Sequence, residues 1–159
     1  MGVSGSGKST IAEELSREMD GEFIDADWLH SPANIAKMST GHELSDEDRM
    51  PWLHSVGHLM QEVVAHGTVP VVACSALKRS YRDVLREYIP DVFFVFLDGP
   101  RDVIQERMNA RHGSFMPASL LASQFAILEP LQEDERGMHV YITTSPEELV
   151  HAVLEELNS

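Results

Sequence analysis

The chain begins with MGVSGSGKST, and this stretch contains a phosphate-binding motif. It fits the pattern G-x-x-x-x-G-K-[ST], in which glycines allow backbone amides to converge on phosphate oxygens at the start of a helix. Lys8 can bridge the β and γ phosphates, and the hydroxyl of Ser9 can ligate magnesium. We therefore expect ATP or a similar nucleotide, with Mg2+, to bind here. The expected contacts are Gly2, Val3, Ser4, Gly5, Ser6, Gly7, Lys8, Ser9 and Thr10.

A second candidate is the acidic triplet Asp25-Ala26-Asp27, which ends the predicted strand EFID at residues 22–25. The carboxyl ends of parallel strands are where α/β proteins bind ligands. Alternate residues project differently there, so one carboxylate can serve magnesium while the other serves an acceptor hydroxyl. Asp46 and Asp48 have the same spacing, but they begin a predicted helix, whose dipole favours negative charge.

The strand predicted over residues 69–74 lacks the aspartate that often supports magnesium in nucleotide-binding proteins. The sequence VVACSALK has Cys74 and Ser75 at that point. No carboxylate from this strand can therefore bind the metal, which makes Asp25 and Asp27 more necessary. Cys74 is expected to be a small buried apolar residue.

Basic side chains are scarce and gather in two places. The first group is Lys78, Arg79, Arg82 and Arg86, and the second is Arg107 and Arg111. Phosphoryl transfer needs cations over the migrating charge and a closing element that excludes water. We therefore expect Arg107 and Arg111 to act in catalysis beside a lid, whereas Arg86 suits a solvated helix face.

The elements that position these residues alternate between strand and helix. Strands are predicted over 22–25, 69–74, 92–97 and 139–143, and helices over 7–19, 31–41, 45–66, 78–89, 100–111 and 145–157. Nearly continuous apolar runs such as VPVVAC and VFFVFL indicate strands buried on both faces of a parallel sheet. The fold class is therefore α/β, with a parallel sheet wrapped by helices through right-handed crossovers. We expect one domain over residues 1–159, with an irregular lid at about 111–124.

Composition excludes several classes of partner. The 159 residues carry a formal charge of −14, which repels nucleic acid and anionic membrane surfaces. The single cysteine excludes an intramolecular disulfide and favours a reducing compartment. No apolar run approaches the roughly 20 residues that span a bilayer. We therefore expect a cytoplasmic protein without nucleic-acid or membrane partners.

Five blocks of the sequence resemble the gluconate kinases, or gluconokinases, small P-loop kinases related to shikimate kinase and the nucleoside monophosphate kinases. In order they are GVSGSGKST, DADWLHSPANIAKMSTGHELSDEDRMPWL, CSALKRSYRDVLR, FVFLDG and ARHGSFMPASLLASQFAILE. The second block is the most specific, since shikimate and nucleotide kinases lack it. The resemblance covers residues 2 to about 130, and the last thirty residues carry little signature.

The resemblance implies transfer of the γ-phosphoryl group of ATP to the 6-hydroxyl of D-gluconate. Lys8 and Ser9 would hold phosphates and Mg2+, Asp27 would orient or deprotonate the hydroxyl, and Asp25 would lie near the metal. The implied acceptor-binding segment contains His30, Asn34, Lys37 and Arg49, although helix entry and capping also explain His30 and Asn34. The candidates for the gluconate carboxylate stay open among Lys37, Arg49, Lys78 and Arg82. An arginine is geometrically the stronger candidate because it binds a carboxylate through two hydrogen bonds.

The resemblance also extends to the lid and the adenine site. Arg107 and Arg111 would neutralise the transition state, and Thr144 and Pro146 would line the adenine. Three further residues match the family pattern without a role that the sequence supplies, namely His112, Phe115 and Gln124. A homodimer is suggested as well, but the sequence does not fix the oligomeric state.

The chain departs from the family pattern at its beginning. About five apolar residues normally precede the phosphate-binding loop and form a strand in the middle of the sheet, whereas only Met1 precedes it here. We expect that first strand to be missing and the natural protein to start several residues upstream. Two other functions remain open: a kinase of the same fold acting on another small sugar acid, and a nucleotide-binding protein without turnover.

Overall fold

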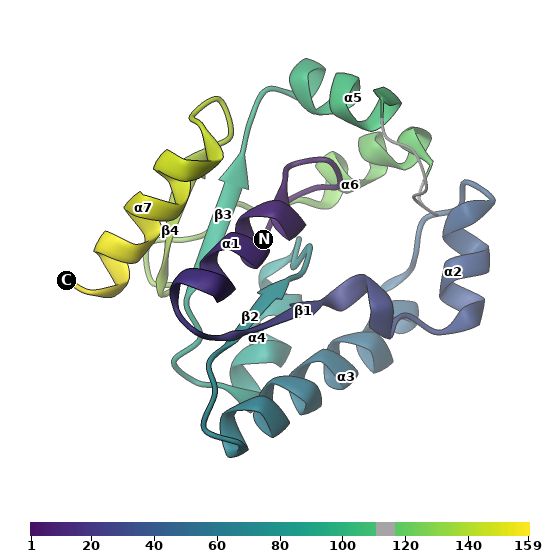
Figure 1. Cartoon of the computed structure of the whole chain (residues 1–159). Coiled ribbons are helices and arrows are strands. Elements are labelled where there is room, and N and C mark those ends of the chain that lie inside the picture. Colours follow the sequence, from purple (N-terminus) through teal and green to yellow (C-terminus); the bar gives the residue numbers. More distant parts are fainter. Residues whose placement is uncertain (111–116) are drawn as a thin grey trace.

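The structure is a computed structural model that describes residues 1–110 and 117–159 (Figure 1). Three residues singled out by the sequence, Arg111, His112 and Phe115, lie outside the described residues. Their predicted roles therefore stay predictions.

Four short strands form two parallel pairs. Strand β1 (Glu22–Asp25) pairs with β2 (Pro70–Ala73), and β3 (Phe94–Asp98) pairs with β4 (Gly137–Tyr141). Each strand is followed by a helical segment, so the α/β class with parallel strands is confirmed. Asp25 is the last residue of β1, which places the acidic triplet at the carboxyl end of the strands as expected.

Backbone hydrogen bonds of Met1 and Gly2 join the two strand pairs. The amino group of Met1 donates to the carbonyl oxygen of Val95 at 2.5 Å, and the N–H of Leu97 donates to Met1 O at 2.9 Å. On the other side, the N–H of Gly2 donates to Ser75 O at 3.1 Å. In Figure 1 the N-terminus accordingly lies between the pairs. Within the described ranges, no strand fills the rest of the space between β2 and β3.

A large, mainly apolar cavity of about 700 Å³ lies beside Met1. Its walls come from α1, β2, β3 and α7, and include Ile11, Leu15, Val71, Val72, Val95 and Val153. These side chains belong to the elements that a middle strand would cover. The sheet is thus interrupted where the resemblance implies its first strand.

The helices surround these strands. They are α1 (Lys8–Glu18), α2 (Pro32–Ser39), α3 (Asp46–Ala65), α4 (Arg79–Tyr88), α5 (Arg101–Ala110), α6 (Leu121–Ile127) and α7 (Pro146–Leu157), with 3-10 turns η1 (Ala26–Leu29) and η2 (Ala118–Leu120). Helix α1 packs against β2 and α7, whereas α3 packs against α4. None of the helices in the described ranges is long and apolar enough to cross a membrane.

Local sequence signals explain where the longest helix begins. Ser45 accepts a hydrogen bond from the N–H of Asp48, and the Asp48 carboxylate accepts one from the N–H of Ser45 at 2.9 Å. This reciprocal capping box satisfies two amides at the start of α3. The expectation that Asp46 and Asp48 serve the start of a helix is therefore confirmed.

One segment differs from its prediction. The stretch after Pro117 was expected to be irregular, but it forms η2 and α6. Leu120, Leu121 and Gln124 are buried, and the last two sit close to one turn apart. This spacing is too short a pattern to indicate a helix from the sequence, and packing against the rest of the fold decides it.

Candidate active site

A small polar pocket of about 30 Å³ lies where β1 and β2 end. It is lined by Ser4, Lys8, Asp27, His30, Met38, Leu44, Arg49, Trp52, Ser75, Leu77 and Gln124. The structure therefore brings together four side chains that the sequence predicted to act on nucleotide or acceptor: Lys8, Asp27, His30 and Arg49. The Asp27 carboxylate, the His30 imidazole and two cations therefore face the same pocket.

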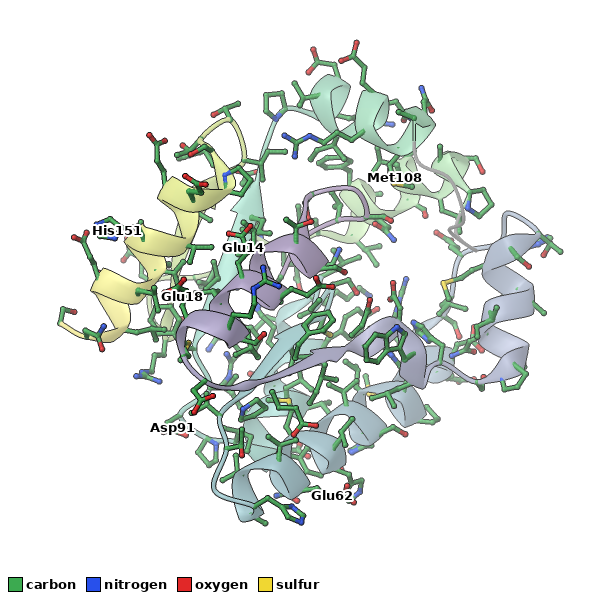
Figure 2. The ribbon with its side chains drawn as sticks, in the orientation of Figure 1. Glu14, Glu18, Glu62, Asp91, Met108 and His151 are labelled. Atoms are coloured by element: carbon green, nitrogen blue, oxygen red, sulfur yellow. The ribbon has the colours of Figure 1, made fainter. Side chains whose placement is uncertain are left out.

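The phosphate-binding loop forms one wall of this pocket. It leads directly into α1, whose first residue is Lys8. Gly5 adopts a φ of +81°, a left-handed conformation that favours glycine. A Cβ at Gly5 would also lie 2.8 Å from the Cγ of Met108, a side chain of α5 labelled in Figure 2. The glycine thus allows both the turn and the close approach of α5.

Asp25 and Ser9 place two oxygen atoms side by side. The Ser9 hydroxyl donates to Asp25 Oδ2 at 3.4 Å, and the N–H of Asp27 donates to Asp25 Oδ1 at 3.0 Å. Burial raises the pKa of Asp25. A bound cation would offset this effect, and hydroxyl and carboxylate oxygens are ligands that Mg2+ prefers.

The residues described form no cage of three or more His, Cys, Asp or Glu side chains. The Ser9 and Asp25 pair suits magnesium, because Mg2+ commonly keeps several waters and binds one or two carboxylates together with substrate phosphates. The residue pair that the sequence predicted for the metal is therefore compatible with it.

His30 forms the apolar side of the pocket. Its ring stacks on Trp52, with ring centroids 4.1 Å apart, and its Nδ1 lies 3.4 Å from Asn34 Nδ2. Burial, with the nearby positive charge of Arg49, lowers the pKa of His30 to about 4. The imidazole is therefore neutral at pH 7, which suits hydrogen bonding to a hydroxyl rather than charge pairing.

Trp52 is a site residue that the sequence analysis did not single out. Its indole N–H donates to the carbonyl oxygen of Ala26 at 2.7 Å, in the buried interior. This bond fixes the turn η1 next to Asp27. Trp52 lies inside the most specific sequence block, but nothing in that block indicates which backbone atom the indole reaches.

Arg49 is held at the pocket by a chain of hydrogen bonds. Its Nη1 donates to the hydroxyl of Tyr81 at 2.9 Å, and that hydroxyl donates to Asp46 Oδ1 at 2.5 Å. Lys78 Nζ lies 3.1 Å from the same carboxylate oxygen. These contacts orient one edge of the guanidinium while the residue still lines the pocket.

Four predicted acceptor residues do not line the pocket, and three of them, Asn34, Lys37 and Lys78, contact the start of α3 instead. Lys37 pairs with Asp48 at 2.6 Å, and Lys78 pairs with Asp46. Asn34 donates to the carbonyl oxygen of Asp48 at 3.0 Å. All three side chains tie α2 or α4 to the first turn of α3, so they hold the acceptor segment together around Arg49.

Arg82, another candidate for the gluconate carboxylate, lies in the interior rather than at the pocket. Its side chain is fully buried and pairs with the buried Glu135, with Nε 2.7 Å from Oε1 and Nη2 3.0 Å from Oε2. Nη1 also donates to the carbonyl oxygen of Ala76 at 2.8 Å. Every nitrogen is engaged inside the protein, and Arg82 does not line the pocket, so its role as a ligand of the gluconate carboxylate stays a prediction. Its partner lies 53 residues away, and nothing in the basic run indicates this pairing.

Arg107 lies near the predicted adenine residues rather than in the pocket. Its Nη2 donates to the carbonyl oxygen of Ile142 at 3.4 Å. This carbonyl belongs to the turn that precedes α7, where Thr144 and Pro146 are exposed. The structure thus groups Arg107, Thr144 and Pro146 at one end of β4.

A phosphate-binding loop, parallel strands and a pocket at their carboxyl ends define a P-loop kinase. The family model described as adenylylsulphate kinase matches residues 1–114. Together these findings place the chain among the P-loop kinases of that family.

Within this class, the relatives are gluconokinases, and the chain belongs to the gluconokinase family. It is 41% identical to the thermoresistant gluconokinase of Escherichia coli, covering 96% of this chain and 87% of the relative. A gluconokinase structure from Sinorhizobium meliloti is 45% identical, with a TM-score of 0.88 and coverage of 99% and 89%. An unliganded sugar kinase from Janibacter is 52% identical, with a TM-score of 0.94 and coverage of 99% and 91%.

Proposed function

We propose that this chain transfers the γ-phosphoryl group of ATP to the 6-hydroxyl of D-gluconate. The observation that carries the proposal is the pocket in which Lys8, Asp27, His30 and Arg49 meet beside the phosphate-binding loop. The gluconokinase relatives support the choice of acceptor. The loop supports ATP as the donor.

In the proposed mechanism Asp27 orients the 6-hydroxyl and accepts its proton. The oxygen then forms a bond to the γ-phosphorus as the bond to the β-phosphate oxygen breaks, which releases ADP. Asp27 suits this role because it lines the pocket, while its backbone N–H is held by Asp25. Much of the catalysis comes from positioning and electrostatics, as in other phosphoryl transfers.

Lys8 and the loop amides are proposed to bind the phosphates, and Ser9 and Asp25 to hold Mg2+. Mg2+ held by these two residues would supply positive charge against the charge that develops on the phosphate oxygens. Lys8 donates to the carbonyl oxygen of Val3 at 3.0 Å, so we infer that it changes partners when nucleotide binds. We also keep Arg107 and Arg111 as proposed catalytic cations, with a lid at about residues 111–124.

Arg49 is proposed to bind the gluconate carboxylate. Of the four cations left open by the sequence, Lys37 and Lys78 pair with aspartates and Arg82 pairs with Glu135. Arg49 lines the pocket, and a guanidinium can bind a carboxylate through two parallel hydrogen bonds. The neutral His30 is proposed to bind an acceptor hydroxyl nearby.

The experiment that tests the proposal is a coupled ADP-release assay. The panel contains gluconate, other sugar acids, shikimate, nucleoside monophosphates and adenylylsulphate. We expect a clear preference for gluconate. A preference for another sugar acid would favour the alternative kinase, and tight ATP binding without product from any acceptor would favour a nucleotide-binding protein without turnover.

Asp27→Asn separates chemistry from binding. We expect kcat to fall by about 10²- to 10⁴-fold, since a positioned general base contributes that much. The ATP dissociation constant should stay within about twofold, as measured by calorimetry. Asp20→Asn is the matched control, because Asp20 is an exposed aspartate outside the pocket and should leave both quantities unchanged. Unimpaired turnover in Asp27→Asn would contradict the mechanism.

A further inference from the structure

The peptide bond between Val3 and Ser4 is hydrogen-bonded through both its carbonyl oxygen and its N–H. The Val3 carbonyl oxygen accepts from Lys8 Nζ at 3.0 Å and from the N–H of Ser6 at 3.3 Å. The Ser4 N–H donates to Gln124 Oε1 at 2.6 Å. Ser4 and Gln124 are each only 7% exposed. A side chain 120 residues away therefore helps set the orientation of a peptide inside the phosphate-binding loop.

Nucleotide binding would affect the contacts of Lys8 and Gln124 with this peptide differently. Lys8 is the lysine of the motif and must turn toward the phosphates, which removes its bond to the Val3 carbonyl. In the bond from Ser4 to Gln124, the accepting oxygen belongs to a side chain outside the motif, and the motif gives that side chain no phosphate to bind. Glycines at positions 2 and 5, both with positive φ, flank this peptide and make the backbone permissive. The glutamine contact is thus the one suited to persist when ATP arrives.

Gln124 is itself anchored between two regions. It lines the polar pocket, and Leu120, one turn earlier, packs with Met38 and Leu44 in a small cluster separate from the main core. Met38 and Leu44 line the same pocket. The segment containing η2 and α6 therefore contacts the acceptor side through Leu120 and the phosphate-binding loop through Gln124.

We propose that Gln124 is a positioning residue that fixes the Val3–Ser4 peptide in the orientation required for nucleotide binding. It acts through the loop backbone rather than on the reacting atoms. The proposal rests on the nucleotide site of the proposed function, but not on the identity of the acceptor. Its effect should therefore fall on ATP affinity more than on the gluconate KM.

The test compares Gln124→Leu with the wild-type chain by calorimetry with ATP alone. Leucine removes the accepting oxygen and leaves the buried Ser4 N–H without that hydrogen-bond acceptor. We expect the ATP dissociation constant to rise by about tenfold or more as a result. We also expect faster hydrogen exchange at the Ser4 amide in the nucleotide-free protein. Gln61→Leu is the matched control, because Gln61 donates to the Tyr88 carbonyl on an exposed surface and should change neither quantity.

The outcomes separate this proposal from the broader one. A wild-type chain that binds no ATP would overturn both. A wild-type chain that binds ATP, with Gln124→Leu binding equally well, would overturn only the role of Gln124. A rise confined to the gluconate KM would also overturn it, in favour of direct acceptor contact. If the leucine variant does not fold, Gln124→Glu keeps a side-chain oxygen there, and faster Ser4 exchange in that variant would contradict the proposal.

Discussion

The carboxyl ends of the strands and the middle of the sheet differ in how fully their residues are packed and hydrogen-bonded. At the strand ends, side chains such as Asp25, Arg49 and Trp52 each have a defined polar partner. In the middle, between β2 and β3, Met1 and Gly2 make the only backbone bridge within the described ranges, beside a cavity of about 700 Å³.

This difference shows that the pocket depends on two things: the hydrogen bonds among its own residues and the stability of the sheet beneath it. The residues that line the pocket come from segments held by capping, which the sequence encodes locally, and by side-chain hydrogen bonds that join distant parts of the chain. The stability of the sheet beneath them depends on apolar burial, which is incomplete at its centre. Changes at the strand ends should therefore alter activity, whereas changes at the centre should alter stability.

The largest expected effect is a loss of stability on replacing Arg82. It is an exception to the division between activity and stability, because Arg82 lies near the strand ends but supports the pocket from inside the core. Arg82→Met removes the fully buried partner of Glu135 and leaves it with Arg86, and breaking a buried pair costs up to about 3 to 5 kcal/mol. We expect the free energy of unfolding, measured with urea, to fall by that amount. The gluconate KM of the folded fraction should change by less than about threefold.

Arg79→Met is the control for this variant, because Arg79 pairs with the exposed Asp134 and the same side-chain change occurs at the surface. Its stability should stay close to that of the wild-type chain. If Arg82→Met instead kept full stability and lost gluconate affinity, Arg82 would act on the acceptor rather than in the core.

The second effect concerns the interrupted sheet. Five valine or isoleucine residues fused ahead of Met1 should pair with β2 and β3 and fill the cavity. Each buried side chain contributes roughly 1.5 to 3 kcal/mol, and ordering each residue costs about 1 to 2 kcal/mol, so a net gain of about 3 kcal/mol is expected. Urea unfolding measures it. Five glycine and serine residues at the same place are the control, and equal stability of the two fusions would show that the slot does not accept a strand.

The sequence predicted the features that depend on nearby residues. The phosphate-binding loop, the capping box at Ser45 and the acidic triplet after β1 all follow from short patterns with a local physical cause. Strand β1 matches its predicted range, 22–25, and helix ends differ by one or two residues in most cases. Such ends are set by local hydrogen bonding, so short-range signals are sufficient for them.

The features that the sequence did not predict depend on distant partners. Arg82 belongs to the same basic run as Arg79 and Arg86. Arg86 also pairs with Glu135, and what distinguishes Arg82 is that its side chain is fully buried against that carboxylate. The contact of Gln124 with Ser4 likewise joins segments 120 residues apart. No pattern of residue spacing in the sequence predicts such pairs, because they arise from tertiary packing.

The third effect is a pH dependence that comes from the middle of the sheet. Burial lowers the pKa of the Met1 amino group to about 5 from its ordinary value of 8.0. Between these values the unfolded chain binds a proton that the folded chain does not, so stability rises with pH. We expect the Met1 amino group alone to contribute a gain of about 1 kcal/mol between pH 6 and pH 7. Thermal unfolding in matched buffers measures it.

The apolar fusion sharpens this prediction, because it replaces the buried amine by an ordinary peptide N–H. Much of the slope should then disappear. A smaller slope of the same sign should remain from His30, whose pKa is lowered to about 4 by burial and which therefore also favours the folded state as pH rises. An unchanged slope in the fusion would contradict the assignment to Met1.

The smallest expected effect tests which cation binds the acceptor. Lys37→Met removes an exposed partner of Asp48, and such surface pairs contribute little to stability. The gluconate KM should therefore stay within about twofold, whereas Arg49→Met should raise it at least tenfold because a charged hydrogen bond to the carboxylate is lost. Steady-state assays at saturating ATP compare the two variants. The reverse order would move the carboxylate site from the pocket to the outer side of α2, and would mean that the pairing of Lys37 with Asp48 opens when gluconate binds.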